Sequence, residues 1–386
     1  MMRLRPFALA LASLVVVADA ALGSAAASPS KRLQETAGDY GVLQQFAPQN
    51  ASTWWAIVES NLKPKTFVVR TSDSGKHWRD VTPPLRRVSS SFFLGAATAW
   101  VEAGALHSAR TAALYRTLDG GRTWRRLGSV ASECQLDFVD QRHGWCVAVG
   151  AATGSETVRL YRTVDGGSSW RLVSRTGLYD RGSTPGALPF SCDKTLTFTS
   201  PRFGWAASYC AGGSPYLYES RDGGARWQRL ATVPLPKGLP TPPAGEGLSL
   251  PAVSGSRLAV SVEIGGSPRG ATAVATSANG GRSWRTRLVP GSLRYWKVDL
   301  VDVDHWTLSD GSTLRATNDA GLHWRHWTSR VSMKDSVGAT LALNFLSPRL
   351  GFAVPDGNSG PLWWTRDGGS SWRALKIVAG PFTVPR

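Results

Sequence analysis

Short apolar segments alternate with polar turns along most of the chain. Three stretches share one arrangement, in which an apolar strand, a polar turn and a Gly-aromatic pair follow one another: LDFVDQRHGW at 136–145, LTFTSPRFGW at 196–205 and LNFLSPRLGF at 343–352. These stretches predict two inner β-strands joined by a turn. A third apolar strand, as at 160–162 or 217–219, leads into a Gly-rich turn, and a fourth follows it, as at 124–127. The inner pattern is weaker at 92–101 and 248–262.

Each group of strands contains one copy of the pattern Ser/Thr-x-Asp/Asn-x-Gly-x-x-Trp. The copies are TSDSGKHW (71–78), TLDGGRTW (117–124), TVDGGSSW (163–170), SRDGGARW (220–227), SANGGRSW (277–284), TNDAGLHW (317–324) and TRDGGSSW (365–372). Their acidic or amide positions are Asp73, Asp119, Asp165, Asp222, Asn279, Asp319 and Asp367. Successive copies lie about 50 residues apart, which is typical of one propeller blade per repeat. We therefore predict an all-β, seven-bladed β-propeller of four-stranded antiparallel blades.

The repeated pattern also predicts a tight hairpin turn with a structural role. An Asp side chain can accept hydrogen bonds from backbone amides two residues on, Gly supplies a position with positive φ, and the Ser/Thr hydroxyl adds a further local bond. The Trp then enters the fourth strand, and we expect its ring to be buried between neighbouring sheets.

The N-terminus has the features of a secretory signal. Arg3 and Arg5 precede an apolar run at 7–17, and small residues with Ala-x-Ala sites follow at 18–20 and 25–27. We expect a signal peptide at 1–27, a linker at 28–39 and the propeller at 40–386. The apolar run is too short to cross a bilayer, and no later segment reaches about 18 uninterrupted apolar residues. The predicted protein is secreted, periplasmic or otherwise extracytoplasmic, has no transmembrane span and is a monomer.

Export makes disulfide bonds possible for the four cysteines, which allow three pairings. Cys134 and Cys146 flank one predicted inner hairpin, and Cys192 and Cys210 flank the next. When Trp145 is aligned with Trp205, both pairs straddle the same turn. We therefore predict the bridges Cys134–Cys146 and Cys192–Cys210. The spacing lacks the Cys-x-x-Cys element of most zinc sites, and no metal site or cofactor is expected.

The chain is strongly basic, with 44 Lys and Arg against 27 Asp and Glu and a net charge of +17. Outside the cytoplasm such a field attracts an anionic protein surface or an anionic cell-envelope polysaccharide. Nucleic acid is not expected, because the chain is exported and its arginines are spread through the repeats. Two long connections, 174–191 and 231–247, are predicted on the face opposite the repeated turns. Basic residues expected on that face are Lys63, Lys65, Arg110, Arg175, Arg181, Lys237 and Arg269.

The repeated segments resemble the Asp-box (BNR) repeat families of the sialidase-like superfamily fold, which include sialidases, xyloglucanases and photosystem II assembly factors. The resemblance spans residues 40–376. Inner strands ending in Gly-Trp combined with the Thr-x-Asp-Gly-Gly-x-x-Trp turn are most similar to the photosystem II assembly and stability factor type. That type implies a non-enzymatic propeller that binds a partner, so we expect a binding or assembly scaffold without enzymatic activity.

The alternative function is glycoside hydrolysis, which needs two carboxylates flanking the scissile bond. Glu59 and Glu102 each follow a predicted second strand in adjacent repeats, on the face where enzymes of these families have their sites. They are the candidate catalytic pair of this alternative. A solvated Glu or one paired with a nearby Arg is the competing structural interpretation. The acidic stretch with Asp299, Asp302 and Asp304 lacks the features of a calcium-binding loop.

Overall fold

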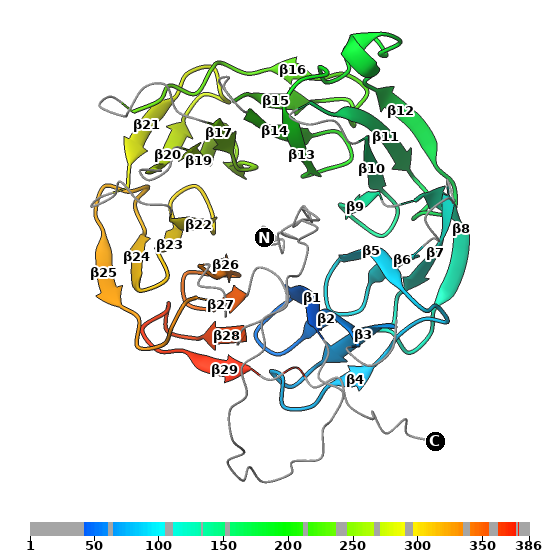
Figure 1. The fold of residues 1–386 in the computed structure, drawn as a ribbon, viewed down its shortest axis with the longest axis horizontal. Coiled ribbons are helices and arrows are strands. Elements are labelled where there is room, and N and C mark those ends of the chain that lie inside the picture. Colours follow the sequence, from blue (N-terminus) through cyan, green and yellow to red (C-terminus); the bar gives the residue numbers. More distant parts are fainter. Residues whose placement is uncertain are drawn as a thin grey trace, which may run out of the picture.

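The strands form a ring of antiparallel sheets around a central axis (Figure 1). The computed structural model describes residues 42–60, 65–104, 111–132, 134–150, 155–210, 215–236, 245–265, 271–289, 296–334, 340–354, 362–375 and 377. The prediction of an all-β propeller with four-stranded antiparallel sheets is confirmed. The predicted signal peptide and linker lie outside the described residues, and no helix in the described part is long and apolar enough to cross a membrane.

Five of the six sheets have four strands each. The first three are β1 (Val42–Pro48), β2 (Trp54–Glu59), β3 (Thr66–Thr71) and β4 (Arg79–Asp80); β5 (Val88–Phe93), β6 (Ala99–Ala103), β7 (Thr111–Thr117) and β8 (Arg125–Ala131); and β9 (Gln135–Phe138), β10 (Gly144–Gly150), β11 (Thr157–Thr163) and β12 (Arg171–Arg175). The last two are β22 (Lys297–Leu300), β23 (Trp306–Ser309), β24 (Thr313–Thr317) and β25 (Arg325–Thr328); and β26 (Ala342–Phe345), β27 (Gly351–Val354), β28 (Leu362–Thr365) and β29 (Arg373–Leu375).

The sixth sheet has nine strands and lies between β12 and β22 in the chain. Its strands are β13 (Asp193–Phe198), β14 (Gly204–Cys210), β15 (Leu217–Ser220), β16 (Gln228–Arg229), β17 (Gly245–Leu248), β18 (Ala252–Ser254), β19 (Arg257–Gly265), β20 (Ala271–Ser277) and β21 (Arg285–Leu288). Pairing of β17 with the end of β14 joins the β13–β16 strands to the β17–β21 strands. Pro251 lies between β17 and β18, where its missing N–H interrupts the inner strand.

The repeated segments form turns with one shared set of hydrogen bonds, and we call them the box turns. In each, the Ser/Thr hydroxyl donates to Oδ1 of the Asp or Asn at 2.7–3.0 Å. The same Oδ1 accepts the backbone N–H four residues on, at 2.9–3.0 Å. The expectation of a bond two residues on is therefore wrong for the carboxylate. The amide two residues after the Asp or Asn, that of a Gly, instead donates its N–H to the Ser/Thr hydroxyl oxygen at 2.8–3.1 Å.

Each box turn is also bonded to the turn between the first two strands of its own repeat. The residue after the Asp or Asn donates its N–H to a carbonyl of that turn at 2.8–3.0 Å, as Gly166 does to Arg142 and Gly223 to Arg202. Glycines at these positions have positive φ, such as 75° at Gly166. The box turns therefore share one face of the ring with the inner turns, and we call it the box face. The opposite side is the loop face.

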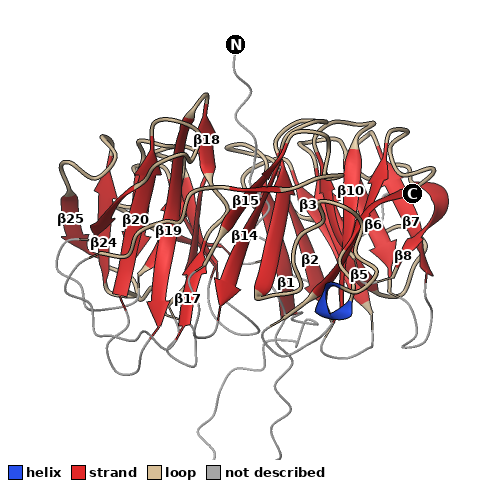
Figure 2. Cartoon of the chain, turned by 90° about the horizontal axis from the view of Figure 1, so that it is seen from above, coloured by secondary structure: helices blue, strands red, loops and turns tan. Residues whose placement is uncertain are grey.

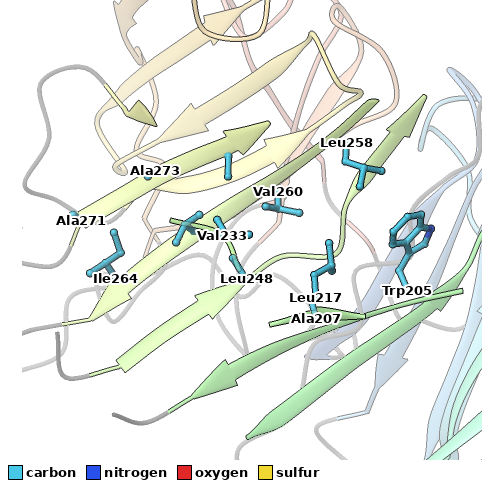
Figure 3. Close-up of a cluster of buried hydrophobic side chains, with 12 residues drawn as sticks. Trp205, Ala207, Leu217, Val233, Leu248, Leu258, Val260, Ile264, Ala271 and Ala273 are labelled. Atoms are coloured by element: carbon cyan, nitrogen blue, oxygen red, sulfur yellow. The ribbon is translucent and has the colours of Figure 1, made fainter. Parts of the chain in front are cut away.

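The hydrophobic core is divided into clusters that lie between neighbouring sheets. Trp100 stacks on Phe138 and Trp145 stacks on Phe198, each pair with ring centroids 3.7 Å apart. Figure 3 shows one cluster, in which Trp205 and other residues of β13–β16 meet Val260 and its neighbours in β17–β21. Another cluster contains residues of both the first and the last sheet, which are therefore neighbours in the ring. Each box-turn Trp packs onto the cluster between its own sheet and the preceding one. The expected burial is complete only for Trp227, and the other six box-turn Trp residues are half-buried.

Both predicted disulfide bonds are present. Cys134 is joined to Cys146 across the β9–β10 hairpin, and Cys192 is joined to Cys210 across the β13–β14 hairpin. The bridges occupy different positions along their hairpins, because Cys146 is the third residue of β10 and Cys210 is the last residue of β14. Both bridges nevertheless join the segment before the first strand of a sheet to its second strand.

Candidate functional site

The candidate site is a segment of the loop face that connects β12 to β13, residues 176–192. It contains the single described helical turn, η1 (Leu178–Asp180), which lies at the lower edge of the ring in Figure 2. The segment is held by hydrogen bonds at both ends: Arg175 donates through Nε and Nη2 to the Gly182 carbonyl at 3.0 and 2.6 Å, and the Phe190 N–H donates to Asp180 Oδ1 at 2.7 Å. Within the segment Leu188 is buried, and its carbonyl accepts a hydrogen bond from the Thr176 hydroxyl. The connection is therefore an ordered platform.

The backbone of this platform has unusual conformations. Tyr179, Asp180 and Cys192 have positive φ values of 50°, 59° and 55°. Non-glycine residues adopt this region at an energetic cost, and such conformations persist only where the surroundings impose them. Here the surroundings include the Cys192–Cys210 bridge. Strained residues are frequent at binding and catalytic sites, so this cluster marks the segment as a functional candidate.

A buried lysine supports the end of the platform. Lys194 is only 7% exposed, and its Nζ donates to the carbonyls of Ser191 and Cys192 at 2.5 and 2.8 Å. Its backbone N–H donates to Glu156 Oε2 at 3.0 Å. Burial lowers the pKa of Lys194 to about 8, and Glu156 opposes that shift. Burial likewise raises the pKa of Glu156.

A tyrosine completes this polar cluster. The Tyr216 hydroxyl donates to the Ser191 carbonyl and lies 3.0 Å from the Ser191 Oγ. Burial raises the pKa of Tyr216 to about 12. Arg229 lies over the Tyr216 ring, 5.5 Å from its centroid. The cluster fixes the residues around Cys192 and so positions the platform above it.

The platform presents apolar side chains to solvent. Leu178 is 56% exposed and Tyr179 is 76% exposed, and the Tyr179 ring meets Phe190 edge-on at 5.3 Å. Arg181 is also exposed, and it is separated from Tyr179 by Asp180, whose Oδ1 accepts the Phe190 N–H. An exposed aromatic residue with a cation in the same short segment, on a backbone that is already ordered, suits recognition of a partner more than solvation alone.

The structure brings together only part of the predicted basic face. Arg181 belongs to the platform, and Arg175, the last residue of β12, uses its guanidinium to hold it. Lys65 lies two sheets away, at the start of the first sheet's third strand, with its Nζ 4.5 Å from the Phe67 ring centroid. The other predicted residues, which lie outside the described residues, are Lys63, Arg110, Lys237 and Arg269.

The two carboxylates of the hydrolase alternative lie in different environments. Glu59 is at the surface, where it accepts hydrogen bonds from Gln44 at 3.0 Å and Arg87 at 3.3 Å. Glu102 is fully buried within β6. Only Glu59 is therefore open to a ligand in solution.

The acidic stretch around β22 is also engaged in contacts. Asp299 accepts a backbone N–H from the neighbouring sheet, Asp302 accepts from His305, and Asp304 pairs with Arg257. Within the described ranges, no group of three or more His, Cys, Asp or Glu side chains is arranged to hold a metal ion.

Sequence reasoning did not identify Glu156, Lys194 or Tyr216. One signal was available for the lysine, because Lys194, Leu196 and Phe198 alternate on the buried side of β13. A Lys on the apolar face of a strand needs local partners. Nothing in the sequence pattern singles out the other two residues.

Comparison with known proteins shows relatives in fold only. No family model matches the chain, and no curated protein matches it. Among solved structures, YCF48 bound to a D1 peptide has 16% identity, covers 85% of this chain and 94% of its own, and superposes with a TM-score of 0.52. The GH74 xyloglucanase from Xanthomonas campestris has 16% identity and a TM-score of 0.53; the alignment covers 86% of this chain and 52% of the enzyme. A polysaccharide lyase of family PL25, an ulvan lyase, has 11% identity and a TM-score of 0.54 over 88% of this chain and 97% of its own. The chain thus shares its β-propeller fold with both a peptide-binding protein and polysaccharide-degrading enzymes.

Proposed function

We propose that this protein is an extracytoplasmic, non-enzymatic propeller with seven Asp-box blades, and that it is a scaffold for an anionic protein partner. The count of seven takes the nine-stranded sheet as two blades, β13–β16 and β17–β21, joined through β17. Each blade then contains one box turn. The two disulfide bonds support an oxidising compartment outside the cytoplasm.

The observation that carries the binding proposal is the ordered platform at 176–192. Exposed Leu178 and Tyr179 would supply apolar contact, and Arg181 would supply charge to an acidic partner. Because hydrogen bonds and the Cys192–Cys210 bridge already order the segment, little conformational entropy is lost on binding. YCF48, which shares the fold, was solved with a bound peptide. A mixed apolar and cationic surface fits a protein or peptide better than a uniformly charged polymer.

The hydrolase alternative has weaker support. Retaining and inverting glycosidases both require two carboxylates that reach the same glycosidic bond. Glu59 is occupied by Arg87 and Glu102 has no exposed surface. A polysaccharide hydrolase activity that Glu59→Gln abolishes would replace the scaffold proposal with the enzymatic one.

A peptide-binding experiment tests the proposal. Labelled synthetic peptides that vary in net charge and in apolar content are titrated with the protein, and binding is followed by fluorescence anisotropy. Acidic peptides with an apolar residue should bind. Raising the salt concentration should weaken their binding, since exposed charges are screened over about 8 Å at physiological ionic strength.

Matched variants locate the site. Tyr179→Ala and Arg181→Glu should each weaken binding about tenfold, which corresponds to about 1.4 kcal/mol. Arg282→Glu on the box face makes the same charge change as Arg181→Glu and should leave affinity within about threefold. Equal losses from Arg181→Glu and Arg282→Glu would mean diffuse attraction, and the platform would not be the site.

A further inference from the structure

The outer wall of the ring is unusually rich in arginine. The residue after each box-turn Trp begins an outer strand, and in six of these strands it is an exposed arginine: Arg79, Arg125, Arg171, Arg285, Arg325 and Arg373. In β16 the same position is Gln228, followed by exposed Arg229. The outer strands contain no lysine, and their single carboxylate, Asp80, accepts hydrogen bonds from Thr82. Because these strands follow the circumference in Figure 1, the arginines form a belt around the ring.

The first three sheets differ from the others in the third-strand residue that lies directly opposite this outer-strand arginine. There the third-strand partner is also arginine, and the pairs are Arg70 with Arg79, Arg116 with Arg125, and Arg162 with Arg171. At the equivalent register in the fifth, sixth and last repeats the partners are Thr276, Ala316 and Trp364. Like charges directly opposite each other destabilise a sheet. Three consecutive unfavourable pairs indicate a function that offsets their effect on stability.

The third-strand arginines are oriented in advance. Arg70 donates through Nε to the Ala96 carbonyl at 3.0 Å, and Arg162 donates through Nη2 to the Pro201 carbonyl at 3.0 Å. Both acceptors belong to the next sheet, so each arginine pair lies at a junction between sheets. Each guanidinium also lies over a buried indole, Arg70 over Trp55 at 5.4 Å and Arg162 over Trp145 at 5.7 Å.

The positive charge at these junctions is only partly balanced. Burial lowers the pKa of Arg70, and the neighbouring Arg122 and Arg79 lower it further. Burial and a neighbouring arginine also lower the pKa values of Arg116 and Arg162, where the box-turn carboxylates Asp165 and Asp222 act in the opposite direction. Within the described part of the chain, no carboxylate forms a salt bridge with any of the six arginines. An external anion would relieve the repulsion.

We propose that these six residues, the arginine arc (Arg70, Arg79, Arg116, Arg125, Arg162 and Arg171), bind a linear acidic polysaccharide. The guanidinium fork matches a carboxylate with two parallel hydrogen bonds, which a lysine cannot provide. The same arrangement recurs at three successive junctions, so it suits an extended polymer with many acid groups better than a single small anion. The outer strands of these sheets, β4, β8 and β12, contain no aromatic residue to select a particular protein side chain. The arc is separate from the platform at 176–192 and does not depend on its partner.

The test uses polygalacturonate as the acidic probe and dextran as the neutral one, with binding followed by affinity electrophoresis and calorimetry. The folded wild-type protein should bind polygalacturonate and not dextran. The triple variant Arg79→Ala, Arg125→Ala, Arg171→Ala removes the exposed member of each arc pair and should weaken binding at least tenfold. The triple variant Arg79→Lys, Arg125→Lys, Arg171→Lys keeps the charge but loses the guanidinium fork. Its affinity for polygalacturonate should lie between that of wild type and that of the alanine triple variant.

A charge-matched control separates the arc from general attraction. The variant Arg285→Ala, Arg325→Ala, Arg373→Ala removes three arginines from the same register in other sheets and should keep affinity within threefold of wild type. Peptide binding at the platform should persist in all three variants, so failure of the arc does not affect the proposed scaffold function. Equal weakening by the two alanine triples would overturn the proposal, and so would tighter binding of single-stranded DNA than of polygalacturonate. Thermal unfolding of each variant establishes that it is folded.

Discussion

The box face and the loop face of this propeller are built on opposite principles. On the box face every repeat forms the same turn, with the same hydrogen bonds between residues within four positions of one another. On the loop face the connections differ, and the one at 176–192 contains positive-φ residues and a buried Lys194. The repeated face satisfies its own polar groups locally. The variable face depends on contacts between distant residues, and it displays Leu178 and Tyr179. Repetition therefore maintains the ring, while the variable connections are available for function.

The largest expected effect concerns the bridge below the platform. The double variant Cys192→Ala, Cys210→Ala should lower the free energy of unfolding by about 2–4 kcal/mol, because the reduced unfolded chain gains conformational freedom. Urea denaturation measures the change. Peptide binding at the platform should also weaken, whereas the double variant Cys134→Ala, Cys146→Ala should lose stability with less effect on that binding. Similar binding losses in both would contradict a specific role of Cys192 in positioning the platform.

A box turn tests the repeated face. Asp165→Ala should lower the free energy of unfolding by about 1–3 kcal/mol, because the donors of Thr163 and Ser169 lose their acceptor. Asp165→Asn should cost less, because Asn279 already makes the equivalent bonds in its own turn, with Oδ1 accepting from Ser277 and the Ser283 N–H. Chemical denaturation of the two variants gives the comparison. Equal losses would mean that the negative charge, and not the hydrogen bonds, stabilises the turn.

The two faces should also respond to different ranges of pH. On the box face, hydrogen bonds from Thr123 lower the pKa of Asp119 to about 2, and those from His323 do the same for Asp319. A lowered carboxyl pKa stabilises the fold above the unfolded value near 4, and this stabilisation is lost as the pH falls toward 2. Unfolding free energy measured from pH 5 to pH 2 should therefore decline.

Residues of the loop face should change the free energy of unfolding at alkaline pH. The pKa of Lys194 is about 8 in the folded protein, below its ordinary 10.5, so the unfolded chain holds more protons between these values and stability rises with pH there. Above about pH 10, Tyr216 ionises in the unfolded chain before it does in the folded protein, where its pKa is about 12, so this residue makes stability fall with pH. Lys194→Met should remove the rise between pH 8 and 10 and leave the acidic decline unchanged. A persistent alkaline rise in the variant would assign it to another group.

The smallest expected stability effect is at the exposed tyrosine. Tyr179→Ala should change the free energy of unfolding by no more than about 0.5 kcal/mol, because the side chain is mostly in solvent. The same variant should lose peptide affinity. Denaturation and binding measured on one preparation therefore separate recognition from stability, and a large loss of stability would make Tyr179 a structural residue.

The repeated turns, their spacing and the cysteine register were sufficient to predict the fold class and both disulfide bonds. These features are local, since the hydroxyl, the carboxylate or amide and the Gly that form a box turn lie within a few residues of one another. Strand alternation likewise places Lys194 on the same side of its strand as Leu196 and Phe198. The limits of the inner strands at 248–262 could not be predicted from the sequence pattern, because Pro251 divides the inner edge into β17 and β18.

The sequence by itself determined the propeller, the bridges and the overall positive charge of this protein, and only the tertiary structure decided where its distinctive sites lie. Glu156 and Lys194 are 38 residues apart and meet only because their sheets are adjacent. Glu102 becomes buried and Glu59 becomes paired for the same reason. Each arginine pair of the arc spans one box turn, and only the adjacency of the first three sheets brings the three pairs together as an arc. Local hydrogen bonding can be inferred from residue order, but burial and charge proximity depend on which sheets the ring places side by side.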